Sequence, residues 1–330
     1  ENGIKEVILA VHFMAETLRN ACGRSKYGMK LRYSRDSLVK SKGSRTHVPL
    51  GTGGAIKRAE KFLGGKEPFI VMNGDILTDI EYSEVIEKHI SAGGAGTIAL
   101  HRVENPSRYG IVRLTRGNKI AEFIEKPQGM IPSNLANAGI YVLSPRIFNY
   151  IQPGKTCSVE REVFPRLARD GMLYGHEFDG LWVDIGKPAD FIEANRLLLE
   201  SRITMLSSPT KDVGKGTEMK RDVAIGKGVV LGEDSTIGPN VSIGERVVVG
   251  NRVHIRNSII FPHTRIGDHV TIDGAIVGQS VTIKKGVEIR RGCLIGDGAL
   301  IQVDATLRQD TKVCPSGKVA KDTPVSKCLV

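Results

Sequence analysis

Carboxylates that follow short apolar strands are the first residues in this sequence that suggest chemistry. Asp75 follows the apolar run at residues 69–72, and Asp184 follows the run at residues 181–183. In open α/β sheets, ligands bind beyond the carboxyl ends of the strands, so both aspartates are candidates to meet a metal or a substrate. Two such carboxylates can share one Mg²⁺, which prefers oxygen ligands and keeps phosphate and water oxygens as well. Each aspartate could equally be part of a simple turn that ends its strand.

A lysine and a glycine-rich turn could serve a phosphorylated ligand. Lys126 precedes Pro127, which keeps it out of a helix, so its ammonium group could act as a point charge for a phosphate. A surface salt bridge explains Lys126 equally well. The motif PLGTGGA at residues 49–55 opens an expected helix, where glycines allow close approach of a ligand and unpaired N–H groups face oxygens or nucleobase edges. A glycine-rich turn before a helix is as often purely structural.

An amide and a carboxylate further along the chain suit the hydroxyl groups of a sugar. Asn137 begins the stretch NAGIYV, and Glu160 follows Ser158 and Val159. Asn137 could also merely cap a turn. The eight histidines are scattered, and no Ser/His/Asp or Cys/His arrangement is evident, so the sequence does not indicate nucleophilic catalysis.

The positive charge of the chain is concentrated in two segments. The formal net charge is +11, of which residues 24–46 carry +7 and residues 308–330 carry +3. We expect a loop-like basic insertion and a basic tail, both solvated. Few aromatic residues and no recognition motif accompany them, so we do not expect nucleic acid as a partner.

Length and composition place the chain among globular proteins of about two domains. It has 330 residues, 40% of them hydrophobic and 25% charged. Its longest aliphatic runs are too short to span a membrane, and no secretion signal is evident, which predicts a cytoplasmic protein. Five widely spaced cysteines fit neither a disulfide framework nor a zinc site, and we expect them to be reduced.

The first two hundred residues alternate apolar runs with helical patterns, which predicts an α/β domain with a mixed, mostly parallel sheet. The expected strands are 4–13, 69–72, 97–103 and 140–143, and the expected helices are 54–63, 82–92 and 188–202. Residues 203–221 lose this periodicity and gain Ser, Gly, Pro and Lys, as in a linker.

An internal repeat follows the expected linker. Aliphatic residues recur every six positions from Ile225 to Ile255 and, after two steps of eleven, continue to Ile301. This period fits neither a helix nor a hairpin array, but it fits short strands that meet at the corners of a triangular coil. We therefore expect a hexapeptide-type β-helix of about four to five turns over residues 222–306, with a basic tail at 307–330. Similarity to hexapeptide-repeat proteins implies that it is left-handed.

Taken in order, the motifs of the first domain resemble those of sugar-1-phosphate nucleotidyltransferases, and most closely those that make GDP-mannose. The resemblance is carried by residues 49–55, 73–75, 96–112, 125–128, 137–145, 160–165 and 182–191. It implies a Rossmann-like domain over residues 1–202 that transfers a nucleoside monophosphate from an NTP to a sugar 1-phosphate and releases pyrophosphate. The expected substrates are GTP and mannose 1-phosphate, and the expected assembly is a homo-oligomer held by the β-helix.

The resemblance also implies a role for each matching residue. Asp75 and Asp184 would hold Mg²⁺, Lys126 would bind the sugar phosphate, and the nucleotide would lie against Gly53, Gly54 and Asp75. The sugar would lie among four residues, namely Gly110, Glu125, Asn137 and Glu160.

The family begins with a strand and a glycine-rich loop that cradle the triphosphate, and neither precedes Ile4 here. We therefore expect either an N-terminally incomplete domain or a non-catalytic regulatory or scaffolding relative. Two further hypotheses are a glucose-1-phosphate nucleotidyltransferase and an acyltransferase that uses His254 or His263 of the β-helix as a base. The sequence leaves open the sugar, the nucleotide, the size of the oligomer and the role of the two basic segments.

Overall fold

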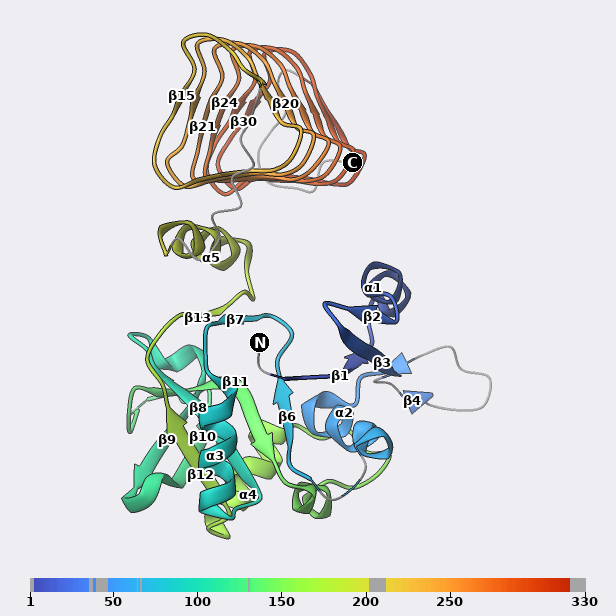
Figure 1. Cartoon of the computed structure of the whole chain (residues 1–330), viewed down its shortest axis with the longest axis vertical. Helices are drawn as coiled ribbons and strands as arrows, with labels where there is room; N and C mark the ends of the chain where they lie inside the picture. The colour runs from blue at the N-terminus through green and yellow to red at the C-terminus, as the bar shows by residue number, and fades with distance from the viewer. Residues whose placement is uncertain are drawn as a thin grey trace. The chain divides into compact units, whose positions relative to one another are not determined.

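The computed structural model describes residues 3–35, 38–39, 47–63, 65, 67–129, 131–201 and 212–320. The chain divides into two compact units, Glu1–Trp182 and Val183–Val330 (Figure 1). None of the helices in the described ranges is long and apolar enough to cross a membrane.

A six-stranded sheet forms the centre of the first unit, with its strands in the order β6-β11-β8-β12-β10-β9. Its strands are β6 (Phe69–Met72), β8 (Gly96–Arg102), β9 (Gly110–Thr115), β10 (Lys119–Glu125), β11 (Leu135–Leu143) and β12 (Leu173–Glu177). Strands β8 and β12 are parallel, and the other neighbouring pairs are antiparallel. The sheet is therefore mixed, as expected, but the expected predominance of parallel pairs is wrong. Short connections such as the turn at 116–118 join β9 to β10, and such connections permit only antiparallel neighbours.

Helices cover both faces of this sheet (Figure 1). Successive residues of a strand point to opposite faces, so β8 places Ile98 and Leu100 in one buried cluster and Ala99 in another. The first cluster also contains Phe164 of α4, and the second contains Val85 of α3. The helices of the unit are α1 (Ala15–Cys22), α2 (Gly51–Ala59), α3 (Tyr82–Ala92), α4 (Phe164–Arg169) and the π-helix η5 (Val159–Val163), with 3-10 turns η1 (Glu60–Phe62), η2 (Pro106–Arg108), η3 (Arg116–Asn118) and η4 (Pro145–Tyr150).

Smaller sheets complete the first unit. β1 (Glu6–Val11) pairs in parallel with β3 (Met29–Arg35), which pairs with β2 (Ser25–Lys26), while β4 (Leu38–Val39) pairs with β5 (His47–Val48). β7 (Ile76–Thr78) pairs with β13 (Trp182–Asp184), whose first residue ends the first unit. The basic stretch at 24–46 was expected as a loop, whereas its described part forms β2, β3 and β4. The alternation of apolar and basic residues in MKLRYSR explains the strand.

The second unit is a parallel β-coil whose strands stack in three sheets of seven, six and six, which makes about six turns (Figure 1). The first sheet contains β14 (Asp212–Val213), β17 (Val230–Leu231), β20 (Val248–Val249), β23 (Arg265–Ile266), β26 (Thr282–Ile283), β29 (Leu300–Ile301) and β32 (Lys318–Val319). The second contains β15 (Glu218–Met219), β18 (Thr236–Ile237), β21 (His254–Arg256), β24 (Thr271–Asp273), β27 (Glu288–Ile289) and β30 (Thr306–Leu307). The third contains β16 (Val223–Ile225), β19 (Val241–Ile243), β22 (Ser258–Ile260), β25 (Ile276–Val277), β28 (Leu294–Ile295) and β31 (Lys312–Val313).

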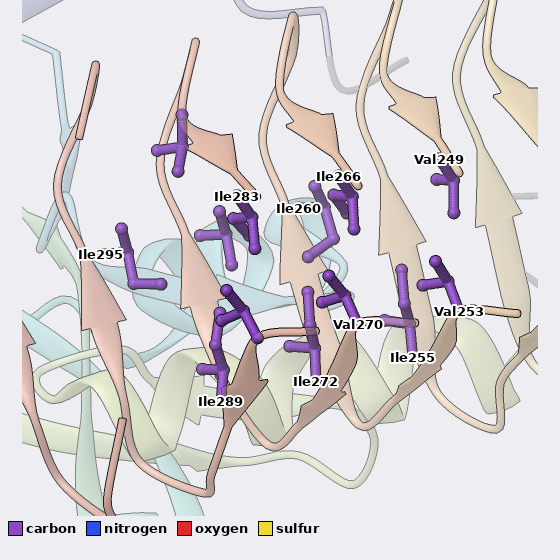
Figure 2. Close-up of a cluster of buried hydrophobic side chains, with 14 of the residues drawn as sticks. Val249, Val253, Ile255, Ile260, Ile266, Val270, Ile272, Ile283, Ile289 and Ile295 are labelled. Carbon is purple, nitrogen blue, oxygen red and sulfur yellow. The ribbon is translucent and has the colours of Figure 1, made fainter. Parts of the chain in front are cut away.

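The hexad residues point into the coil and stack along it, as Figure 2 shows for Ile255, Ile272 and Ile289. These three lie in register on successive turns and are at most 1% exposed. The two steps of eleven in the sequence each hide a further inward residue, Ile260 and Val277, because one side of the triangle is a residue shorter there. The repeat is thus continuous through both steps.

The coil is longer at both ends than the range 222–306 expected from the repeat. Within the described residues it runs from Asp212 to Val319. Val213 and Met219 extend the six-residue spacing before Ile225, and Leu307, Val313 and Val319 extend it after Ile301. The first two strands of the coil, β14 and β15, lie in the expected linker, and its last two, β31 and β32, lie in the expected basic tail.

Helix α5 (Pro188–Glu200) belongs to the second unit, although the sequence places it at the end of the first domain. Ser242 of the coil donates a hydrogen bond of 2.5 Å to Asn195, and Phe191 stacks on Phe261 with ring centroids 6.4 Å apart. The compact units consequently divide about twenty residues before the boundary expected at 202.

Three of the cysteines, Cys22, Cys157 and Cys293, are free thiols, as expected. Cys314 is disulfide-bonded, so the expectation that all five are reduced is wrong for this residue.

The stacked aliphatic interior should dominate the stability of the second unit. Ile272→Ala removes a fully buried side chain and leaves a cavity between two turns, so we expect the free energy of unfolding to fall by about 2–5 kcal/mol. Urea denaturation followed by circular dichroism measures this loss. Thr271→Ala, on the same strand with an exposed side chain, is the matched control, and an equal loss in both variants would contradict the assignment of the ladder as the core.

Candidate active site

The first turn of α2 packs closely on the segment around Cys157. The amides of Gly53 and Gly54 donate to the Cys157 carbonyl at 2.9 and 3.3 Å, and the Cys157 amide donates to the Leu50 carbonyl at 2.8 Å. A Cβ added at Gly51, whose φ is +71°, would lie 2.6 Å from the Cys157 carbonyl oxygen. The glycines of PLGTGGA therefore permit two backbones to meet, and the two amides that were expected to face a nucleobase have a partner within the chain.

This contact brings Thr52 against Glu160. The Thr52 hydroxyl donates to Oε2 of Glu160 at 2.6 Å and accepts from the Val159 amide at 2.9 Å. Ser158, which caps η5, donates to the same oxygen at 2.8 Å and accepts from the Arg161 amide at 3.1 Å. Glu160 itself lies on the π-helix, a rare helix type that often occurs at functional sites. Two hydroxyl protons thus hold one oxygen of this carboxylate.

Glu125 is the second carboxylate of the site and is half-buried at the end of β10. Burial and the negative charge of Glu160 raise the pKa of Glu125 above its ordinary value of 4.5, although Lys126 and Arg161 oppose the shift. Gly110 lies opposite Glu125 on β9, and a Cβ there would lie 2.7 Å from Oε2 of Glu125. Gly110 consequently leaves the space that this carboxylate occupies.

Asn137 and Tyr141 complete the polar surroundings of Glu160. The Asn137 side chain accepts from the Gly139 amide at 2.9 Å and donates to the Tyr141 hydroxyl at 3.0 Å. Tyr141 is buried, and this burial, together with the charge of Glu160 and a hydrogen bond to it, raises the pKa of the phenol. These two hydrogen bonds fix the orientation of the Asn137 amide.

Asp75 lies in an exposed turn just beyond the carboxyl end of β6. Its carboxylate has no hydrogen bond or ion pair to the described part of the chain. The preceding Asn73 packs against Gly139, where a Cβ would lie 2.8 Å from the Asn73 side-chain nitrogen, and its amide donates to the Gly139 carbonyl at 2.9 Å. The NGD and NAG motifs are therefore neighbours in space.

Lys126 follows Glu125 directly and is exposed. Its φ is +48°, and its amide donates to the Tyr109 carbonyl at 3.0 Å. The positive charge of Lys126 lies close enough to Glu125 to lower the pKa of that carboxyl, against the larger effects that raise it.

Asp184 ends β13 and is half-buried, and it belongs to the second unit. The chain leading to it is fixed in the first unit, because the Trp182 indole donates to the Ala138 carbonyl at 2.9 Å and Leu181 bonds Asp79. Among the described residues, no group of three or more His, Cys, Asp or Glu side chains could hold a metal.

The first unit thus brings together four residues expected around a sugar, which are Gly110, Glu125, Asn137 and Glu160. The sequence analysis missed Thr52, Ser158 and Tyr141 as polar partners of this group. Thr52 lies within the PLGTGGA motif, and Tyr141 lies four residues after Asn137, so both could be located in the sequence. Only the fold shows that Thr52 contacts Glu160 and that Tyr141 contacts Asn137.

The raised pKa of Glu125 predicts a pH-dependent stability. Over an intermediate pH range the folded state still holds the proton of Glu125, whereas the unfolded chain has released it. The stability that Glu125 contributes is therefore present at low pH and is lost as the pH rises through the raised pKa of the folded state. Glu125→Gln should therefore gain stability relative to the parent chain between about pH 4 and about pH 8.

Urea denaturation across that range measures the difference. Glu122→Gln, exposed on the same strand, is the matched control. A constant difference between Glu125→Gln and the parent chain, or one that falls with pH, would contradict the burial of Glu125 beside Glu160.

Comparison of the chain with known proteins identifies the family to which it is similar. The family described as nucleotidyl transferase matches residues 1–201, and the GMPPB C-terminal domain matches residues 219–329. The mannose-1-phosphate guanylyltransferase catalytic subunit beta of Dictyostelium discoideum is 39% identical over 202 residues, which are 60% of this chain and 53% of that protein. The mannose-1-phosphate guanyltransferase beta-A of Xenopus laevis is 37% identical over 201 residues, 60% of this chain and 53% of that protein.

The chain spans about half the length of the curated relatives that it matches. Because the family match covers more than half of the chain and includes every motif of the site, the chain belongs to the nucleotidyl transferase family.

Proposed function

We propose that this protein transfers GMP from GTP to mannose 1-phosphate, forming GDP-mannose and pyrophosphate. The relatives named above are guanylyltransferases of mannose 1-phosphate, which supports the choice of substrates. The observation that carries the proposal is the meeting of Glu125, Asn137 and Glu160 in one half-buried polar site, since such acceptors suit sugar hydroxyls.

The reaction needs positioning and charge neutralisation rather than a covalent nucleophile. A phosphate oxygen of the sugar 1-phosphate attacks the α-phosphorus of GTP, and the bond from that phosphorus to the bridging oxygen of the β-phosphate breaks, so pyrophosphate leaves. We propose that Lys126 holds the sugar phosphate, while Glu125 and Glu160 hold the sugar hydroxyls. Gly110 leaves room beside Glu125.

The nucleotide is proposed to lie along the first turn of α2 and beside Asp75. Gly53 and Gly54 would contribute their closely packed backbone rather than their amides, which donate to Cys157. The guanine base would then lie against a rigid surface, because hydrogen bonds to the Cys157 carbonyl hold this turn in place.

Asp75 and Asp184 are proposed to hold a Mg²⁺ ion. The exposed Asp75 carboxylate suits this role, and a Cβ at Gly186 would lie 3.3 Å from Asp184 Oδ1, so glycine keeps space beside that carboxylate. Two protein carboxylates fit a cation that retains water and substrate phosphate oxygens. When bound, the ion would neutralise phosphate charge as it develops.

A non-catalytic relative would keep the sugar site but would not turn over substrate. A panel of NTPs and sugar 1-phosphates, glucose 1-phosphate among them, assayed by pyrophosphate release, separates the two cases. Assembly through the β-coil and a cytoplasmic location remain predictions from the sequence.

The metal proposal makes a direct prediction for the full-length protein. Asp75→Asn and Asp184→Asn should each lower Mg²⁺-dependent pyrophosphate release by at least about 100-fold, because a metal supplies several kcal/mol of charge stabilisation. Asp273→Asn, which changes a carboxylate paired with Arg256 on the coil, should leave the rate unchanged. Undiminished turnover in either of the first two variants would refute the metal site.

A further inference from the structure

The hydroxyl of Thr52 joins two parts of the first unit that the proposed function assigns to different substrates. Thr52 lies in the first turn of α2, on the nucleotide side, and Glu160 lies on η5, on the sugar side. They are 108 positions apart in the chain, yet their side-chain oxygens are 2.6 Å apart. A direct contact of this length involving a carboxylate is among the stronger hydrogen bonds in proteins.

The direction of this hydrogen bond is fixed by its neighbours. A hydroxyl has one proton, and the Thr52 oxygen already accepts the Val159 amide at 2.9 Å. Its proton is therefore directed at Oε2 of Glu160. Ser158 follows the same rule, since it accepts the Arg161 amide and donates to the same Oε2.

Two hydroxyl groups, those of Thr52 and Ser158, hold the Glu160 carboxylate in one orientation. With Oε2 held by two hydroxyls, rotation of the carboxylate would break both bonds. The buried Tyr141, itself held by Asn137, supports the same group from β11. The carboxylate is therefore oriented before any ligand arrives, which lowers the cost of binding.

We propose that Thr52 is a positioning residue that orients Glu160 for the sugar 1-phosphate. The inference rests on the proposed function for the identity of that ligand. Thr52 does not contact the sugar in this account; it acts through Glu160.

Thr52→Val keeps the shape of the side chain and removes the hydroxyl, both as the donor to Glu160 and as the acceptor of the Val159 amide, and Thr52→Ser keeps a hydroxyl at this position. For the full-length protein we expect Thr52→Val to raise the Kd and the KM for mannose 1-phosphate by about tenfold or more. The kcat should stay within about threefold of the parent value, because an interaction of equal strength in the ground state and the transition state changes KM and not kcat. Thr52→Ser should stay within about twofold of the parent protein in all three. Isothermal titration calorimetry and steady-state pyrophosphate release give these values.

Thr156→Val is the matched control. The Thr156 hydroxyl also joins the two segments, because it donates to the Pro49 carbonyl at 3.4 Å, but it is not bonded to Glu160. Its removal should leave the affinity for mannose 1-phosphate unchanged. Parent-like affinity in Thr52→Val, or an equal loss in Thr52→Val, Thr52→Ser and Thr156→Val, would overturn the proposal.

A double-mutant cycle tests the link without any substrate. Thr52→Val and Glu160→Gln, alone and together, should show a coupling of about threefold or more in the unfolding equilibrium constant, whereas additive effects would contradict the link. If the parent protein does not bind mannose 1-phosphate but the cycle shows coupling, the proposed function fails, while the link by which Thr52 holds Glu160 is confirmed.

Discussion

The packing of the first turn of α2 against the backbone of Cys157 is the contact on which the rest of the site depends. It joins segments about a hundred residues apart and requires glycine at Gly51, where any side chain would meet the Cys157 carbonyl. Once the two backbones are hydrogen-bonded, Thr52 lies within reach of Glu160, and Glu160 lies close enough to Glu125 to influence its proton affinity. The chemistry of the site thus follows from a backbone contact.

The two units of the chain are stabilised in different ways. The first depends on long-range contacts, because β6, β8, β11 and β12 come together from distant parts of the sequence. The second depends on a repeat, because each turn of the coil pairs with the turn about eighteen residues away and stacks aliphatic side chains on it. The coil therefore needs only a residue of suitable size at each hexad position, whereas the site in the first unit needs particular residues at particular places.

This difference explains what the sequence could predict. β6 and α3 have the predicted bounds, and the coil was predicted as a class, because each depends on a local pattern. Strand β11 begins five residues earlier than predicted, since Gly139, at φ +72°, interrupts the alternation without ending the strand. The coil continues to Val319 because Val and Leu replace the Ile-Gly pairs while keeping the six-residue spacing.

The pairing of β6 with β11 and the Thr52–Glu160 contact had no local signal, because both arise where distant segments of the chain meet. Asn137 and Glu160 were predicted as sugar contacts from their residue types, and Gly110 and Glu125 from family resemblance. The structure gives a physical reason for the grouping of all four. Their role as sugar contacts stays a prediction.

A crystal structure of the full-length protein with GDP-mannose and Mg²⁺ tests this account most directly. We expect the mannose hydroxyls within hydrogen-bonding distance of Glu125, Asn137 and Glu160, with the ion held by Asp75 and Asp184. Mannose bound elsewhere on the molecule, with Glu160 still bonded only to Thr52, Ser158 and Tyr141, would show that the carboxylate pair is structural and that the proposed active site is wrong.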